Sequence, residues 1–140
     1  MKQRRNATAA ECDRLWAQIV LARARGRCYL CKRILPLEAH HIIFRSQSSD
    51  PVIRFDPDFG VGLCVDCHHH APDAPHVNNG RFLLAIGTWM ADRERQRWFK
   101  IQPFLFKAVP PFYGPVDCAE TARRLREQLR GDGCRAGINP

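Results

Sequence analysis

The sequence lacks the features that would place a chain in a membrane or send it out of the cell. No run approaches the ~18 consecutive apolar residues of a membrane span. The N-terminal stretch MKQRRNATAAECDRLW starts with basic residues, but no apolar segment follows as in a signal peptide. There is no internal repeat, and 140 residues allow one domain with a modest core but not two ordinary ones. We therefore expect a single cytoplasmic domain over residues 1–140 with no membrane contact.

Acidic residues are scarce relative to basic ones. The chain has 14 Asp and Glu against 22 Lys and Arg, which gives a formal net charge of +8. This balance favours a polyanionic partner, most simply nucleic acid, because each phosphate that is neutralised releases condensed counterions. A basic protein without such a partner has the same composition, so charge alone does not decide the function.

A fully paired disulfide framework is also excluded, because the number of cysteines, seven, is odd. In the reducing cytosol, clustered cysteines indicate metal binding before disulfides. Four of them form two CxxC pairs, CYLC and CVDC, and each tight turn can direct two thiolates to one ion. Four thiolates complete a tetrahedral site of the structural zinc type. The predicted ligands of this Zn²⁺ are Cys28, Cys31, Cys64 and Cys67.

Periodicity and capping signals divide the chain into four parts. A helix is predicted over 8–26, opened by a capping box, and a helical extension over 77–130, followed by a mobile tail over 131–140. The extension comprises a helix over about 80–98, capped by Asn79, and another over about 117–130 that begins at Asp117. Between these two helices, the segment rich in proline and aromatic residues is predicted to be extended and packed on the domain.

The remaining part, residues 27–76, contains two short strands, LEAHHIIF and GVGLC, and a helix start, VDCHHHA, that Pro72 limits to a turn or two. A CxxC pair precedes this hairpin, and the second pair leads into the helix. That order is a treble-clef arrangement. The expected fold is therefore α+β, with a small zinc-stabilised treble-clef core and flanking helices.

The histidines are not needed for a zinc site that sulfur already completes. His40 and His41 follow each other on a strand and so point to opposite faces, and His68 directly follows Cys67. Closing the hairpin brings these positions together. We expect His40 and His68 to bind a second, divalent ion, and His41 to take a proton from water. A one-metal phosphodiesterase needs this division of roles.

The motifs CYLCKR, LEAHHIIFRS and RFDPDFGVGLCVDCHHH together resemble the HNH endonuclease family, in its four-cysteine form common in phage and bacterial proteins. The resemblance covers about residues 27–76. It implies a ββα-metal fold, one catalytic divalent ion (Mg²⁺ or Mn²⁺, with Ni²⁺ or Zn²⁺ as further candidates) and cleavage or nicking of double-stranded DNA. A protein partner, such as one in phage DNA packaging, is implied by the resemblance only.

Position by position, the resemblance makes His40 and His68 metal ligands and His41 the general base. Arg45 resembles family positions that approach the scissile phosphate, although a plain surface arginine fits its position nearly as well.

Two positions depart from the family pattern. Phe59 stands where relatives have an asparagine that braces the loop and orients the base, and phenylalanine cannot do this by hydrogen bonding. Either Asp56 or Asp58 substitutes, or the brace is absent. Pro72 stands where relatives often have a further histidine one helical turn after His68. The replacement ligand is His69, His70 or His76, of which His76 is preferred.

Two functions of different classes follow from these observations. The first is a metal-dependent DNA endonuclease or nickase with His41 as its base. The second is a catalytically degenerate zinc module that binds DNA or a protein partner, which Phe59 and Pro72 favour.

Overall fold

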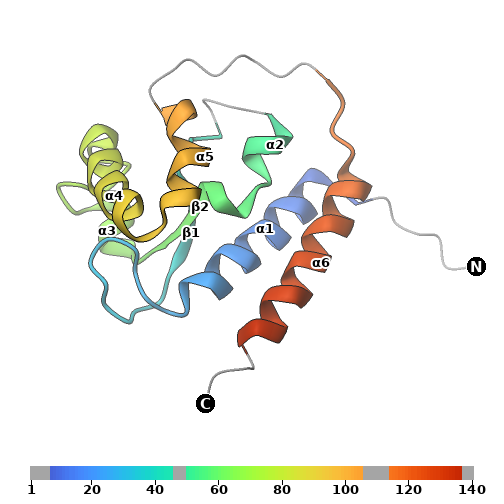
Figure 1. The fold of residues 1–140 in the computed structure, drawn as a ribbon, viewed down its shortest axis with the longest axis horizontal. Coiled ribbons are helices and arrows are strands. Elements are labelled where there is room, and N and C mark those ends of the chain that lie inside the picture. Colours follow the sequence, from blue (N-terminus) through green and yellow to red (C-terminus); the bar gives the residue numbers. More distant parts are fainter. Residues whose placement is uncertain (1–6, 46–49, 106–113, 137–140) are drawn as a thin grey trace, which may run out of the picture.

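A computed structural model describes residues 7–45, 50–105 and 114–136, and in the last helix the side chains only as far as 132. The chain combines helices with one small sheet, which confirms the α+β class (Figure 1). The longer helices are α1 (Ala9–Ala24), α4 (Asn79–Arg93), α5 (Arg95–Leu105) and α6 (Cys118–Ala136). The short elements are β1 (Glu38–His41), α2 (Pro51–Arg54), the 3-10 helix η1 (Pro57–Phe59), β2 (Gly60–Leu63) and α3 (Val65–His69).

Side-chain caps begin three of the four longer helices. The Thr8 hydroxyl accepts a hydrogen bond from the Glu11 amide at 3.2 Å ahead of α1, as predicted. The Asp117 carboxylate accepts one from the Glu120 amide at 2.9 Å at the start of α6, also as predicted. Helix α4 is capped by Asn78, one residue earlier than expected.

The two strands pair antiparallel, and their register decides what meets across the hairpin. His40 lies opposite Val61 and His41 opposite Gly60. Glu38 lies opposite Leu63, so the start of β1 reaches the end of β2, where α3 begins. The register therefore brings β1 next to the helix that carries the second CxxC pair.

Two apolar clusters lie on either side of this hairpin. One joins the sheet to α4 and α5 and contains Phe82, Ile86 and Ile101. The other joins α1 to α6, which lie side by side, and contains Trp16 and Leu125 (Figure 1). Strand β1 separates the clusters, so alternate residues of the strand face different cores.

The segment after α4 differs from the expectation. In place of one helix over about 80–98, the chain breaks at Glu94, and α5 folds back so that the Trp98 ring lies on Gly87. A Cβ at Gly87 would come within 2.8 Å of that ring, so the close approach needs a glycine there. Residues 101–105 are helical and not extended; the rest of the segment expected to be extended is outside the described residues as far as 113.

Two further expectations for the C-terminal half are corrected. The spacing of Phe82, Leu83, Ile86, Trp89 and Met90 predicts that all five lie on the buried side of one helix. Trp89 is instead 40% exposed, and the Lys32 ammonium lies 3.6 Å from its ring centroid. Helix α6 continues to Ala136, so residues 131–136 are helical and are not part of a tail. Across the described parts of the chain, no helix combines the length and apolar character needed to cross a membrane.

Candidate metal centres

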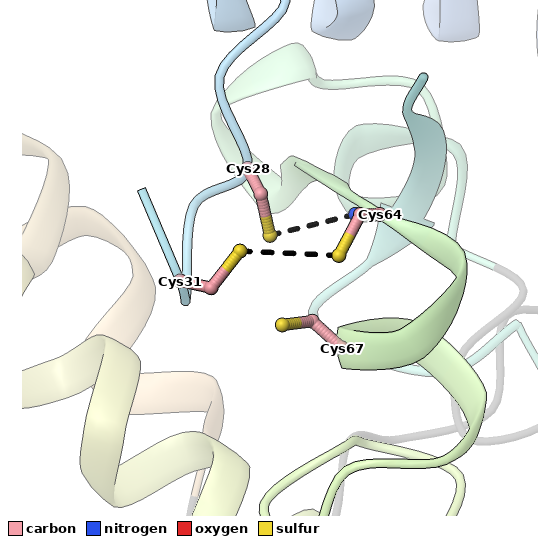
Figure 2. A group of neighbouring side chains, drawn as sticks. All are labelled: Cys28, Cys31, Cys64 and Cys67. Atoms are coloured by element: carbon pink, nitrogen blue, oxygen red, sulfur yellow. Dashed lines mark hydrogen bonds between the residues drawn. The ribbon is translucent and has the colours of Figure 1, made fainter. Parts of the chain in front are cut away.

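The four cysteines of the CxxC pairs lie together, with their sulfurs turned toward one another (Figure 2). Cys28 and Cys31 come from the loop after α1, Cys64 caps α3, and Cys67 lies in that helix's first turn. The four sulfurs lie within 4.8 Å of one another, and those of Cys31 and Cys64 are 3.9 Å apart. Tetrahedral zinc with Zn–S bonds of about 2.3 Å needs sulfurs about 3.8 Å apart. The cluster can therefore hold a metal such as zinc.

Local backbone geometry brings the two cysteines of the first CxxC pair, Cys28 and Cys31, to the same side of a tight turn. Lys32 adopts a left-handed conformation with φ of 62°, and its amide donates to the Cys28 carbonyl at 2.9 Å. The Cys64 amide donates to the Cys28 sulfur at 3.4 Å, which links the two pairs. Burial raises the pKa of Cys64 and of Cys67, whereas hydrogen bonds from Arg33 bring the pKa of Cys31 to about 6 against the effect of burial. A bound cation would relieve the cost of ionising the buried thiols.

A second cluster consists of three histidines. His40 Nδ1 lies 3.1 Å from His68 Nε2, and His76 Nε2 lies 3.2 Å from the same atom. All three ring nitrogens lie within 4.8 Å of one another, so they can hold a metal ion. They come from β1, α3 and the loop before α4.

His76 reaches this cluster although Pro72 ends the preceding helix early. Ala74 is fully buried, and its amide donates to the Ala71 carbonyl at 2.9 Å. Its carbonyl then accepts from the Val77 and Asn78 amides. These turns bring the chain back over α3, so a residue eight positions after His68 meets it. Of the three replacement ligands considered, the structure brings His76 to the cluster and leaves His70 exposed at the end of α3.

Glu38 orients the central ligand, and the sequence analysis did not identify it. Its carboxylate accepts a hydrogen bond from His68 Nδ1 at 2.6 Å and one from His69 Nε2 at 2.9 Å. A proton on Nδ1 leaves the lone pair on Nε2, the nitrogen that faces His40 and His76. Ligating histidines commonly have such a carboxylate behind them. The available signal was strand alternation, because Glu38 and His40 are two residues apart on β1.

His40 is the most buried member of the histidine cluster. It is 4% exposed, its Nε2 has no hydrogen-bond partner among the described residues, and its ring meets Phe82 edge to face at 5.3 Å. Burial, with the neighbouring His68 and His76, lowers the pKa of His40 to about 3. The ring is therefore neutral at physiological pH, and a neutral imidazole is the form that binds metal.

His41 lies on the other face of β1, against α1. Its ring stacks on Trp16 with centroids 3.7 Å apart and planes 7° apart. Its Nε2 donates to the Arg54 carbonyl at 3.0 Å, which leaves Nδ1 as the unprotonated nitrogen. Burial lowers the pKa of His41 to about 4, so the ring is neutral near pH 7.

Phe59 and the two aspartates considered as replacements for the missing asparagine, Asp56 and Asp58, have other partners in the structure. Phe59 is 2% exposed and meets Phe104 edge to face at 5.7 Å in the core. Asp56 and Asp58 both bind Lys100, at 2.6 and 2.7 Å. The backbone carbonyl of Arg54 takes the bracing role toward His41 instead.

Arg45 helps to line a pocket of about 510 Å³ that adjoins both faces of β1. Its side chain is 56% exposed and forms a loose ion pair with Asp13 at 3.7 Å. The residues that line the pocket are Ala39, His40, His41, Phe44, Arg45 and His76. The pocket therefore brings together two of the clustered histidines, the stacked histidine and a largely exposed cation.

Comparison with known proteins found no matching family model, no matching curated protein and no matching solved structure. The four-cysteine cluster and the histidine cluster therefore rest on this chain's own geometry.

Proposed function

We propose that the chain is a metal-dependent phosphodiesterase whose active site is the pocket between His41 and the histidine cluster. More particularly, it is an HNH-type endonuclease or nickase of double-stranded DNA, with a treble-clef core over residues 27–76. The observation that carries this proposal is the pocket. Its lining includes two members of the histidine cluster, His40 and His76, together with His41 and Arg45.

The four-cysteine cluster supports the proposed core. A zinc ion there would tie the loop after α1 to the end of β2 and the start of α3, on either side of the hairpin. The hairpin carries His40 and His41, and α3 carries His68. A structural zinc at this point therefore positions the residues of the proposed active site without taking part in the reaction.

His41 is the proposed general base. Its Nε2 donates to the Arg54 carbonyl, so Nδ1 is free to accept a proton from water as the water attacks the scissile phosphorus. His40, His68 and His76 would hold the divalent ion, which would supply positive charge for the phosphate and for the oxygen that leaves as its bond to phosphorus breaks. Arg45, largely exposed beside the pocket, is placed to bind a backbone phosphate.

The donor set bears on the choice of ion. Mg²⁺ prefers carboxylate, carbonyl and water oxygens, whereas imidazole suits zinc, nickel and related transition metals. The cluster offers three imidazole nitrogens, and the nearby Glu38 carboxylate is engaged by His68 and His69. We therefore favour an imidazole-binding transition metal such as Ni²⁺ or Zn²⁺ over Mg²⁺ or Mn²⁺ as the catalytic ion.

Plasmid nicking tests the proposal directly. The purified protein is incubated with supercoiled plasmid and each of Mg²⁺, Mn²⁺, Ni²⁺ and Zn²⁺, beside His41→Ala and the control His70→Ala, which alters an exposed histidine outside the cluster. We expect nicking by the wild type, a loss of roughly 10²-fold or more in His41→Ala, and unchanged cleavage in His70→Ala. Cleavage that survives unchanged in His41→Ala contradicts the assigned mechanism.

A zinc module that binds DNA without cutting it is the second candidate. The burial of Phe59 in the core favours it, because no side-chain amide stands where related nucleases have their asparagine. The net charge of +8 suits DNA under either candidate. One tightly bound zinc per chain, no second divalent ion, and salt-dependent DNA retention without nicking would establish this alternative.

A further inference from the structure

Helix α1 lies outside the residues that carry the nuclease resemblance, yet two of its side chains reach the surroundings of His41. Asp13 and Trp16 are three residues apart and so lie on one face of the helix. Trp16 stacks on the imidazole of His41, and Asp13 binds Arg54, whose carbonyl accepts the hydrogen bond from that imidazole. The base is thus contacted from α1 in two ways.

The Trp16 ring is itself held in place. It is 2% exposed, and its Nε1 donates to the Asp56 carbonyl at 3.0 Å. Its edge lies over Gly60, the residue opposite His41 in the sheet. A Cβ at Gly60 would come within 2.5 Å of Trp16 Cζ2, so the Trp16 ring can lie here only because residue 60 has no side chain. A stacking partner fixed in this way restricts the plane of the His41 ring.

The Arg54 carbonyl is held in place by two neighbours. The guanidinium binds the Asp13 carboxylate through two hydrogen bonds, Nε to Oδ1 at 3.1 Å and Nη2 to Oδ2 at 2.6 Å. The next residue, Phe55, is fully buried in the cluster between α1 and α6. The ion-paired guanidinium of Arg54 and the buried ring of Phe55 thus hold the backbone on both sides of the Arg54 carbonyl, which accepts the hydrogen bond from His41 Nε2.

We propose that α1 is a positioning element for His41: Trp16 sets the plane of its ring, and the Asp13–Arg54 pair sets the carbonyl that directs its Nε2. This arrangement performs the bracing that an asparagine at position 59 would perform in a related nuclease. The effect on catalysis rests on the proposed function, whereas the effect on the His41 ring does not. Asp13 and Trp16 are positioning residues, since neither lines the pocket.

Kinetics of plasmid nicking test the catalytic part. Trp16→Leu removes the stacking surface and Trp16→Phe restores an aromatic one, while Ile19→Ala is the control for lost packing, because Ile19 is a fully buried residue of the same helix and cluster. We expect kcat to fall about 10- to 100-fold in Trp16→Leu with KM nearly unchanged, and Trp16→Phe to recover most of the loss. A kcat in Trp16→Leu no lower than in Ile19→Ala overturns the inference.

Asp13→Asn provides a variant that leaves no cavity. Asp13 is half-buried and polar, so the substitution weakens its close pairing with Arg54 and its looser pairing with Arg45 while the core stays intact. A loss that passes through Arg45 would raise KM, because Arg45 is the proposed phosphate-binding residue, whereas a loss through the His41 ring lowers kcat. Glu120→Gln is the control for losing an ion pair with an arginine, because the Glu120–Arg123 pair is exposed on α6, far along the chain from His41. We expect kcat to fall in Asp13→Asn and not in Glu120→Gln. An unchanged kcat in Asp13→Asn removes the Asp13–Arg54 half of the proposal.

The NMR spectrum separates this inference from the proposed function, because it needs no activity. The carbon-bound protons of a ring stacked on an indole at 3.7 Å are shifted upfield by the indole ring current. We expect the assigned His41 ring protons to be upfield in the wild type, to remain so in Ile19→Ala and to move downfield in Trp16→Leu. If the wild type cuts no DNA with any ion, the proposed function fails and these shifts alone decide the inference. Shifts that do not change in Trp16→Leu overturn it.

Discussion

The four-cysteine cluster and the three-histidine cluster both gather possible metal ligands, but they are built in opposite ways. The cysteines come from two local CxxC turns, and three of the four are buried. The histidines come from three separate elements, and one of them, His76, is exposed. A closed set of thiolates suits a structural ion, and an open set of imidazoles beside a pocket suits an exchangeable one. The contrast fits the proposal that the cysteine cluster maintains the fold and the histidine cluster binds the catalytic ion.

The largest effect that sharpens this comparison is expected from Cys64→Ser. Loss of a structural zinc ligand removes binding energy that, in small zinc domains, amounts to folding energy of order 10 kcal/mol. We expect this variant to lose its cooperative thermal transition and its bound zinc. His76→Ala, which alters an exposed ligand of the other cluster, is expected to keep both. Unfolding of His76→Ala, seen by circular dichroism, would mean that the two clusters do not differ in this way.

Acid should act on the stability of the metal-free histidine cluster through His40. Its pKa is lowered to about 3 in the folded chain, whereas the unfolded value is about 6.5. Between these values the unfolded chain binds more protons, so stability falls as the pH falls below 6.5 and is unaffected by this group above it. Between pH 6.5 and 5 the loss is about 2 kcal/mol.

Urea unfolding of the zinc-containing protein at pH 6.5 and 5 measures this loss. His40→Phe, which keeps an aromatic ring at the site and cannot titrate, is the control. The cysteine site contributes equally to both proteins, so the difference between them isolates His40. An identical loss of stability in both proteins contradicts the assignment of the loss to His40.

Glu38→Gln should weaken the histidine cluster without touching the cysteines. A neutral amide is a weaker acceptor for His68 Nδ1 than the carboxylate, and its NH₂ group can face the ring instead, so it fixes the His68 tautomer less well. Losing such a partner costs about 10- to 100-fold in metal affinity. Calorimetric titration with Ni²⁺ measures the change. The zinc content, determined separately, should stay the same. An unchanged Ni²⁺ affinity would show that Glu38 does not orient a ligand.

The smallest effect is expected from His69→Ala. His69 also donates to Glu38, at 2.9 Å, but its side chain is 40% exposed and it is not part of the three-histidine cluster. We expect a change of less than about 1 kcal/mol in stability and a Ni²⁺ affinity close to that of the wild type. A loss as large as that in Glu38→Gln would place the metal among Glu38, His68 and His69 instead, a grouping that the same side chains also allow.

Sequence reasoning succeeded where a pattern is local. The CxxC spacing predicts the cysteine cluster, because two residues separated by a tight turn share a ligand direction whatever surrounds them. The caps of α1 and α6 were predicted for the same reason, since a side chain and an amide three residues apart need no other element. The helix break at Glu94 was missed because the contact that accompanies it, Trp98 on Gly87, joins residues on either side of the break, too far apart in sequence for a pattern of one helical turn to reveal.

The candidate site likewise combines features that local patterns predict with contacts between distant segments. The residue types, and the alternation that sends His40 and His41 to opposite faces of one strand, follow directly from the amino-acid sequence. Three contacts instead depend on tertiary packing: that of His76 with His68, the hydrogen bond of His41 to the Arg54 carbonyl, and the stacking of Trp16 on the His41 ring. These contacts join residues from 8 to 25 positions apart, or use a backbone group that every residue possesses. No local pattern encodes them, because they depend on how turns and packed helices bring distant segments together.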